Sequence, residues 1–158
     1  MKNRRLIDTL SIIALLLATL FTANSCMPIP DEPTETLNGI WRCSTMNADI
    51  IIEGDRAVLY NSPASPNRYD RSLWDFVFEY GWVKKGEPVI TDFVKTARLT
   101  YSCQMLWYSY YATGGILSGI EWHDGVITLS DDFYSFTVVS EDDYGNQQKL
   151  TFERMLKL

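Results

Sequence analysis

The sequence offers little material for acid–base or nucleophilic catalysis. Its one histidine, His123, lies beside an expected hairpin turn at Asp124-Gly125, on the polar face of its predicted strand. A Ser-His-Asp triad would depend on this side chain, and the chain lacks the G-x-S-x-G pattern that presents a nucleophilic serine. We therefore expect His123 to be a surface residue and the protein not to be an enzyme.

Carboxylates are the other abundant chemical groups. The acidic turns Asp131-Asp132 and 141–146 carry oxygen ligands suited to calcium, but they lack the spacing of any calcium loop, so we expect solvated turns. Paired acids for glycoside hydrolysis are the one catalytic arrangement that the carboxylates leave open. One histidine and so few cysteines do not make a zinc site. We expect no metal and no cofactor.

The first 25 residues have the organisation of a secretion signal. Three basic residues within the first five precede an apolar segment, 10–21, that is short for a membrane span. The boundary Thr-Ala-Asn-Ser-Cys at 22–26 resembles the lipobox of bacterial lipoprotein signal peptides. The resemblance implies cleavage before Cys26 and attachment of lipid, palmitate included, to that cysteine. An ordinary secretory signal with an incidental Cys26 is the alternative.

Cleavage would change the formal net charge from −6 to −8, because three basic residues and one acidic residue are lost. This balance excludes nucleic acid as a partner and leaves lipid as the only means of holding the protein to a membrane. Residues 26–36, rich in proline and acidic residues, predict an extended tether. Asp31 and Glu32 resemble the acidic signal that sends some Gram-negative lipoproteins to the cell surface, and a solvated spacer is the alternative. We expect an outer-membrane anchor, with the domain facing the periplasm or the surface.

Residues 37–158 predict one all-β domain. A helix is expected at 72–82, with Ser72 as its N-cap and Asp75 completing a capping box. Runs rich in β-branched and aromatic residues, separated by turn residues, predict the strands: 40–44, 49–53, 57–60, 89–93, 99–111, 116–122, 126–129, 133–139 and 148–156. Successive hairpins favour a small antiparallel up-and-down barrel of about eight or nine strands, with a two-sheet sandwich as the alternative.

Aromatic side chains gather toward the end of the longest predicted strand, 99–111. Its odd positions are apolar from Leu99 to Trp107 and its even positions are polar from Thr100 to Gln104, whereas beyond Trp107 tyrosines lie on both faces. Rings at a barrel rim suit stacking on a sugar or closing over an apolar ligand, and packing at the edge of the core is the alternative. The candidate ligand-binding residues are Tyr101, Met105, Trp107, Tyr108, Tyr110, Tyr111 and Trp122.

The first strand carries a family resemblance. Gly39-Ile40-Trp41 resembles the G-x-W signature of the lipocalin and calycin barrels, in which an arginine of the final strand packs across the signature tryptophan. Arg154 holds the corresponding place on the last strand. The layout is similar to that of small lipocalin-like lipoproteins of Gram-negative bacteria. The resemblance implies a structural role for Gly39, Trp41 and Arg154.

Cys43 and Cys103 lie on the apolar faces of their predicted strands. In an oxidising compartment the pair allows either a disulfide inside the barrel or two buried thiols. Two functions follow from the pattern as a whole. One is a non-catalytic, lipid-anchored binding module for a small hydrophobic or glycan ligand. The other is a structural or accessory protein of the cell envelope, with a filled barrel and no small ligand.

Overall fold

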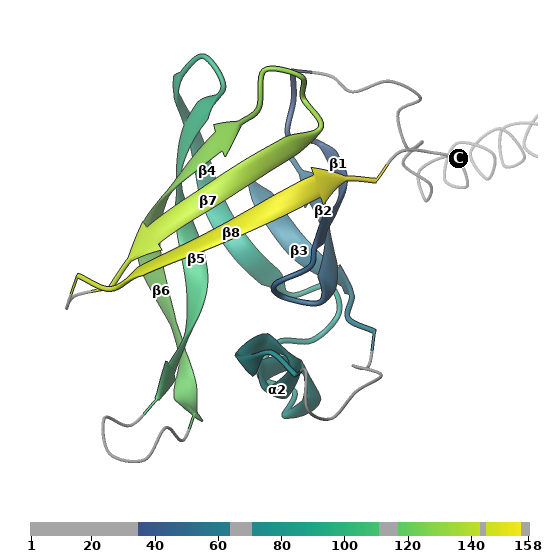
Figure 1. Cartoon of the computed structure of the whole chain (residues 1–158), viewed down its shortest axis with the longest axis vertical. Helices are drawn as coiled ribbons and strands as arrows, with labels where there is room; N and C mark the ends of the chain where they lie inside the picture. Colours follow the sequence, from purple (N-terminus) through teal and green to yellow (C-terminus); the bar gives the residue numbers. More distant parts are fainter. Residues whose placement is uncertain (1–34, 64–70, 111–116, 143–144, 156–158) are drawn as a thin grey trace, which may run out of the picture.

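A computed structural model of the chain describes residues 35–63, 71–110, 117–142 and 145–155. These residues form eight strands and one short helix (Figure 1). The helix is α2 (Leu73–Glu79). The strands are β1 (Gly39–Cys43), β2 (Ala48–Glu53), β3 (Arg56–Asn61), β4 (Pro88–Ala97), β5 (Thr100–Tyr110), β6 (Leu117–Leu129), β7 (Ser135–Glu141) and β8 (Gln147–Arg154).

The strands form a closed antiparallel barrel in which each strand pairs with its neighbours in sequence. β1 closes the ring against β8, with Trp41 opposite Arg154. This confirms the small up-and-down barrel that the sequence predicted. The expected signal peptide, 1–25, and Cys26 lie outside the described residues. Among the residues described, no helix is long and apolar enough to cross a membrane.

β6 is one continuous strand, so the hairpin turn expected at Asp124-Gly125 is wrong. β5 pairs with β6 without interruption through this point, with Gln104 opposite Asp124 and Cys103 opposite Gly125. The glycine serves a close approach and not a turn, because a Cβ at residue 125 would lie 3.1 Å from the Cys103 sulfur. The two short strands expected here are therefore one, and the described barrel has eight strands.

The continuity of β6 also corrects which side chains face inward. Ile127 and Leu129 are buried in the core, and period-two alternation places the other odd positions of the strand on the same face. His123 therefore lies on the core face, where its side chain is only 11% exposed. Trp122, expected on the inward face, points the other way and is 42% exposed.

α2 begins as predicted and ends early. The Ser72 side chain accepts a hydrogen bond from the backbone N–H of Asp75, and the Asp75 carboxylate accepts one from the backbone N–H of Ser72, which confirms the capping box. The sequence predicted a helix through Trp82. It ends at Glu79 because Gly81 adopts a φ of +70°, and the N–H of Trp82 then turns back to the Val77 carbonyl.

A polar network holds α2 across one end of the barrel. Asn47, in the turn between β1 and β2, donates to the Asp75 carboxylate at 2.9 Å. The same amide accepts from Arg42 at 3.0 Å, and Arg42 pairs with Asp49 at 2.9 Å. Asp49 and Asp75 are both buried, so this network fixes the start of the helix against the barrel wall.

Aromatic rings fill the middle of the barrel. Trp41 packs edge-on against Phe136, with ring centroids 4.7 Å apart. Phe136 stacks on Phe152 at 4.6 Å. All three side chains are fully buried and come from three different strands. Because such rings contribute the largest apolar area in a small core, they account for much of its packing.

Arg154 closes the end of the barrel opposite α2. Its guanidinium carbon lies 4.1 Å from the Trp41 ring, which is the contact that the lipocalin resemblance implied. Desolvation lowers the pKa of this buried guanidinium, and its hydrogen bonds compensate the burial. They go to the carbonyls of Thr36, Asn38 and Phe133.

Gly39 and the Trp41 indole complete this end. Gly39 has a φ of +134°, a conformation that favours glycine, and a Cβ there would lie 3.4 Å from the Arg154 guanidinium. The Trp41 indole N–H donates to the Leu37 carbonyl at 2.7 Å. In the Gly-x-Trp segment, Gly39 thus provides the backbone conformation, and Trp41 provides a buried indole N–H that is hydrogen-bonded.

Candidate functional site

The expected ligand-binding residues do not form one cluster. Tyr101 lies at the end of β5 far from α2, where its ring is 5.9 Å from the Lys95 ammonium. Met105 and Trp107 share one face of the β5–β6 pair, and Trp122 lies on the opposite face. Tyr108 turns toward α2. The side chain of Tyr110 and all of Tyr111 lie outside the described residues.

α2 brings Trp74 to the part of β5 that carries Trp107 and Tyr108. The Trp74 ring meets Tyr108 edge-on at 5.3 Å and stacks on Phe78 at 5.9 Å. Trp74 is 1% exposed and Trp107 is 9% exposed. The sequence indicated Trp74 only as part of an apolar helix face. Its approach to Tyr108 needs the tertiary fold, because 34 positions separate the two residues.

The indole N–H groups of Trp74 and Trp107 are both buried, and neither has a hydrogen-bond partner among the described residues. An indole nitrogen is a donor only, so a partner must supply an acceptor. Leaving a buried donor unpaired costs about 1–3 kcal/mol. Each of these two donors would therefore be stabilised by an oxygen acceptor supplied from outside the described chain.

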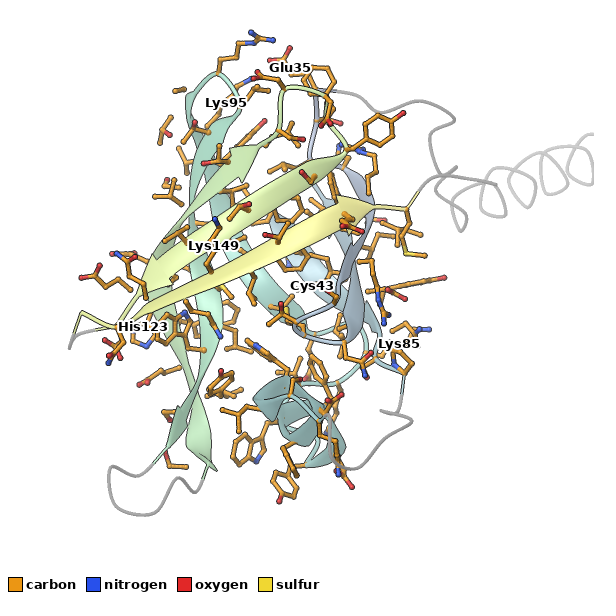
Figure 2. The ribbon with its side chains drawn as sticks, viewed as in Figure 1. Glu35, Cys43, Lys85, Lys95, His123 and Lys149 are labelled. Atoms are coloured by element: carbon orange, nitrogen blue, oxygen red, sulfur yellow. The ribbon has the colours of Figure 1, made fainter. Side chains whose placement is uncertain are left out.

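His123 extends this cluster on the core face of β6. Its ring lies 5.1 Å from the Trp107 ring, and its Nε2 is 3.4 Å from a Glu121 carboxylate oxygen without completing a hydrogen bond (Figure 2). This corrects the expectation of a surface histidine. Trp107 and Tyr108 are adjacent on β5, so the Trp107–His123 and Trp74–Tyr108 contacts lie on opposite faces of that strand. We name these two ring pairs, Trp74 with Tyr108 and Trp107 with His123, the aromatic end cluster.

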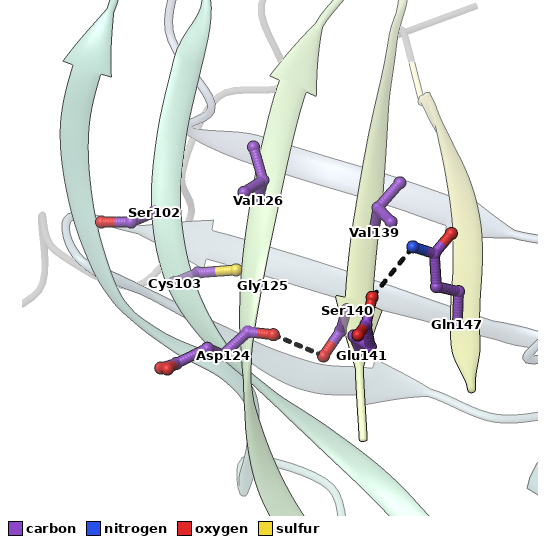
Figure 3. A pocket seen from close by; sticks show the side chains of 9 residues that line it. All are labelled: Ser102, Cys103, Asp124, Gly125, Val126, Val139, Ser140, Glu141 and Gln147. Atoms are coloured by element: carbon purple, nitrogen blue, oxygen red, sulfur yellow. Dashed lines mark hydrogen bonds between the residues drawn. The ribbon is translucent and has the colours of Figure 1, made fainter. Parts of the chain in front are cut away.

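A hollow of about 520 Å³ lies where β5, β6 and β7 meet (Figure 3). On its wall the Cys103 sulfur approaches Gly125 so closely that a Cβ at residue 125 would lie 3.1 Å from it. The buried Ser140 hydroxyl is already used, since it donates to the Asp124 carbonyl at 2.7 Å. The residues lining the hollow are Ser102, Cys103, Asp124, Gly125, Val126, Val139, Ser140, Glu141 and Gln147.

The cysteine in this hollow is Cys103, and its surroundings favour the protonated thiol. Desolvation, with a further contribution from the charge of Asp124, raises the pKa of Cys103 to about 12, so the thiol stays protonated near neutral pH. Burial also raises the pKa of Cys43. Both cysteines are free and buried, the second of the two arrangements that the sequence allowed.

The acidic turns use their carboxylates within the turns themselves. Asp132 accepts hydrogen bonds from the Ser130 hydroxyl and the Tyr134 N–H, which lower its pKa. Asp142 accepts from the backbone and the side chain of Asn146, both at 2.8 Å. Asp143 lies outside the described residues. Within the described ranges, no three histidine, cysteine or acidic side chains are grouped as metal ligands.

Comparison with known proteins adds no family. No protein-family model, no curated protein and no solved structure matches this chain. The candidate site therefore rests on its own geometry, which is a set of buried rings and unpaired donors at the α2 end of the barrel.

Proposed function

We propose that this protein is a non-catalytic binding module of the Gram-negative cell envelope, anchored in the outer membrane through lipid on Cys26. Its lipocalin-like barrel would hold a small ligand at the aromatic end cluster. The ligand class is an apolar or sugar body that carries at least one oxygen acceptor. Rings contact the body, and the indole donors bind the oxygen.

One observation carries this proposal: the buried, unpaired indole N–H groups of Trp74 and Trp107. Elsewhere in the barrel the large buried donors have partners, as the Trp41 indole does. The middle of the barrel is filled by Trp41, Phe136 and Phe152. A ligand would therefore sit against the α2 end and not deep inside the strands.

The test uses the full chain, extracted from membranes in mild detergent. Native mass spectrometry identifies any ligand that co-purifies, and oligosaccharides and eight-carbon fatty acids are titrated while tryptophan emission is followed. Trp74→Phe and Trp107→Phe keep a ring but remove the donor. Each should weaken binding about tenfold, the effect of one net hydrogen bond.

Trp82→Phe is the matched control, because Trp82 is a half-buried tryptophan beyond the end of α2. It should leave affinity unchanged. Absence of any bound or titrated ligand would contradict the proposal, as would wild-type affinity in both donor variants.

A structural or accessory role at the envelope is the second candidate. The filled barrel favours it, since a core packed with rings leaves the surface as the place of contact. The same experiment separates the two functions, because only the binding module responds to small ligands.

A further inference from the structure

β5 and β6 extend past the barrel as a two-stranded ribbon beside α2 (Figure 1). β7 pairs with β6 only over Gly125–Leu129, while β5 pairs with β6 as far as Leu117. α2 packs against the β5 side of this ribbon, through Trp74 and Tyr108. Among the described residues, no strand pairs with the other edge of β6 over residues 117–124. We name this segment the open edge.

The direction of the backbone groups along the open edge follows from three hydrogen bonds. The Leu129 N–H points to the β5 side, where it donates to the Leu99 carbonyl. The Ser130 N–H and the Asp124 carbonyl point to the β7 side. Since these directions alternate along the regularly paired part of a strand, the outward N–H and C=O groups include those of Ile120 and Trp122.

Two large apolar side chains on this edge are exposed to solvent, as is typical of a protein interface. Ile120 is 38% exposed and Trp122 is 42% exposed. Natural edge strands are usually blocked by lysine, proline or a bulge. The register of β6 shifts at Ser118, at the far end of the open edge, and over residues 119–124 the edge carries no lysine, proline or bulge. This regular part is competent to add another strand.

We propose that the open edge pairs with the open edge of a second copy of this chain, antiparallel about a two-fold axis, with Trp122 opposite its own counterpart. The side chains that face each other favour this register. It places Glu121 opposite the second copy's His123, and the reverse, so that a carboxylate meets an imidazole twice. Moving the axis to residue 121 would set the two Glu121 carboxylates against each other.

The contact is short, since β7 limits it to about residues 120–124 of each copy. It is smaller than the roughly 1,200 Å² of a stable soluble complex. We therefore expect the pair to form where the chains are concentrated at a membrane, as lipid on Cys26 would concentrate them.

Cysteine cross-linking of the full chain in membranes tests the pairing. Residues directly opposite each other in such a pair have Cα atoms about 4.5–5.5 Å apart, within the range of a disulfide. Trp122→Cys should give a disulfide-linked dimer of this chain under mild oxidation. Thr128→Cys is the control, since Thr128 is exposed on β6 but lies between β5 and β7.

Three results would overturn the inference. Trp122→Cys cross-linking no more than Thr128→Cys would exclude the interface. A product linked to a different polypeptide would assign the edge to another partner. Glu121→Cys cross-linking faster than Trp122→Cys would exclude the register.

Proline at Ile120 gives an independent test, because it removes an outward N–H and no hydrogen bond to β5. Adding Ile120→Pro to Trp122→Cys should reduce the cross-linked fraction at least about fivefold, as expected for one lost hydrogen bond in each copy. Near-ultraviolet circular dichroism checks that the fold is kept. If proline disturbs it, Ile120→Lys tests the same edge by charge repulsion. An undiminished cross-link in a folded variant contradicts the pairing.

Discussion

The two ends of this barrel differ in whether their buried hydrogen-bond donors have acceptors among the described residues. At the end where β1 begins, the Trp41 indole and the Arg154 guanidinium both donate to backbone carbonyls. At the α2 end, the indoles of Trp74 and Trp107 are as deeply enclosed but have no acceptor within the described part of the chain. Both ends are aromatic and both are packed.

The difference separates structural packing from a candidate site. A buried donor with a partner costs little and rigidifies its surroundings, whereas an unpaired one destabilises the fold unless something else satisfies it. The first end also receives the chain from the expected tether, through Thr36 and Asn38, and Glu35 lies near Lys95 there (Figure 2). We interpret that end as the structural closure and the α2 end as the place of function.

Of the changes predicted here, Trp41→Ala should lower the stability of the protein most. Removing this fully buried ring should lower the free energy of unfolding by about 3–5 kcal/mol, the cost of a large aromatic cavity. Urea denaturation measures it. Trp122→Ala, at an exposed ring, is the control and should change stability by less than about 1 kcal/mol. A loss below about 1 kcal/mol at Trp41 would remove the structural role of this end.

Arg154→Lys should come next, with a loss of about 2 kcal/mol. Lysine keeps the charge but does not reproduce the planar fork that reaches three carbonyls while stacking on Trp41. The midpoint of urea denaturation measures the change. A variant as stable as the wild type would show that the carbonyls find other partners.

The direct comparison of the two ends is Trp41→Phe against Trp74→Phe, measured without ligand. Both remove similar volume, but only the first breaks a hydrogen bond, to the Leu37 carbonyl. Trp41→Phe should therefore destabilise by about 1–2 kcal/mol more than Trp74→Phe. Equal losses at both positions would show that the Trp74 donor is already satisfied, which would weaken the proposed site.

The smallest predicted effect is the pH dependence of the stability that Asp132 contributes. Hydrogen bonds from the Ser130 hydroxyl and then the Tyr134 N–H lower the pKa of Asp132, in the turn whose Phe133 carbonyl receives Arg154. The carboxylate therefore contributes stability that is present above its unfolded pKa of about 3.9 and is lost as the pH falls through the lower folded pKa. Asp132→Asn should be less stable than wild type at pH 6, and the difference should shrink below pH 4. A constant difference in urea midpoints would contradict this account.

Much of the fold followed from local pattern. The capping box at Ser72 and the alternation of β5 depend on residues a few positions apart, so the sequence predicted them correctly. The prediction of a turn at Asp124-Gly125 was wrong. An Asp-Gly pair is typical of a turn, but a glycine within a strand can also be required where a neighbouring side chain, here the Cys103 sulfur, approaches closely. That one error reversed the faces of Trp122 and His123.

The candidate site was predicted only in part. Trp107 and Tyr108 were named from the aromatic run on β5, but Tyr101 and Trp122 lie elsewhere. Trp74 was missed as a site residue, since on its helix it has the spacing of an ordinary core residue. An unpaired donor has no signature in sequence, because the absence of a partner is a property of all the neighbours together.

The sequence by itself determined the strand periodicity and the start of the helix, and the resemblance of Gly39-Ile40-Trp41 to the lipocalin signature implied the contact of Trp41 with an arginine of the last strand. It also carries the predictions of secretion and lipid attachment at Cys26. Only the tertiary structure decided which residues of β6 face the core. Ile127 and Leu129 are buried, and because the strand continues without a turn through Gly125, His123 lies on the same face. It alone placed two unpaired donors at one end and left one strand edge open, since both depend on contacts between residues distant in the chain.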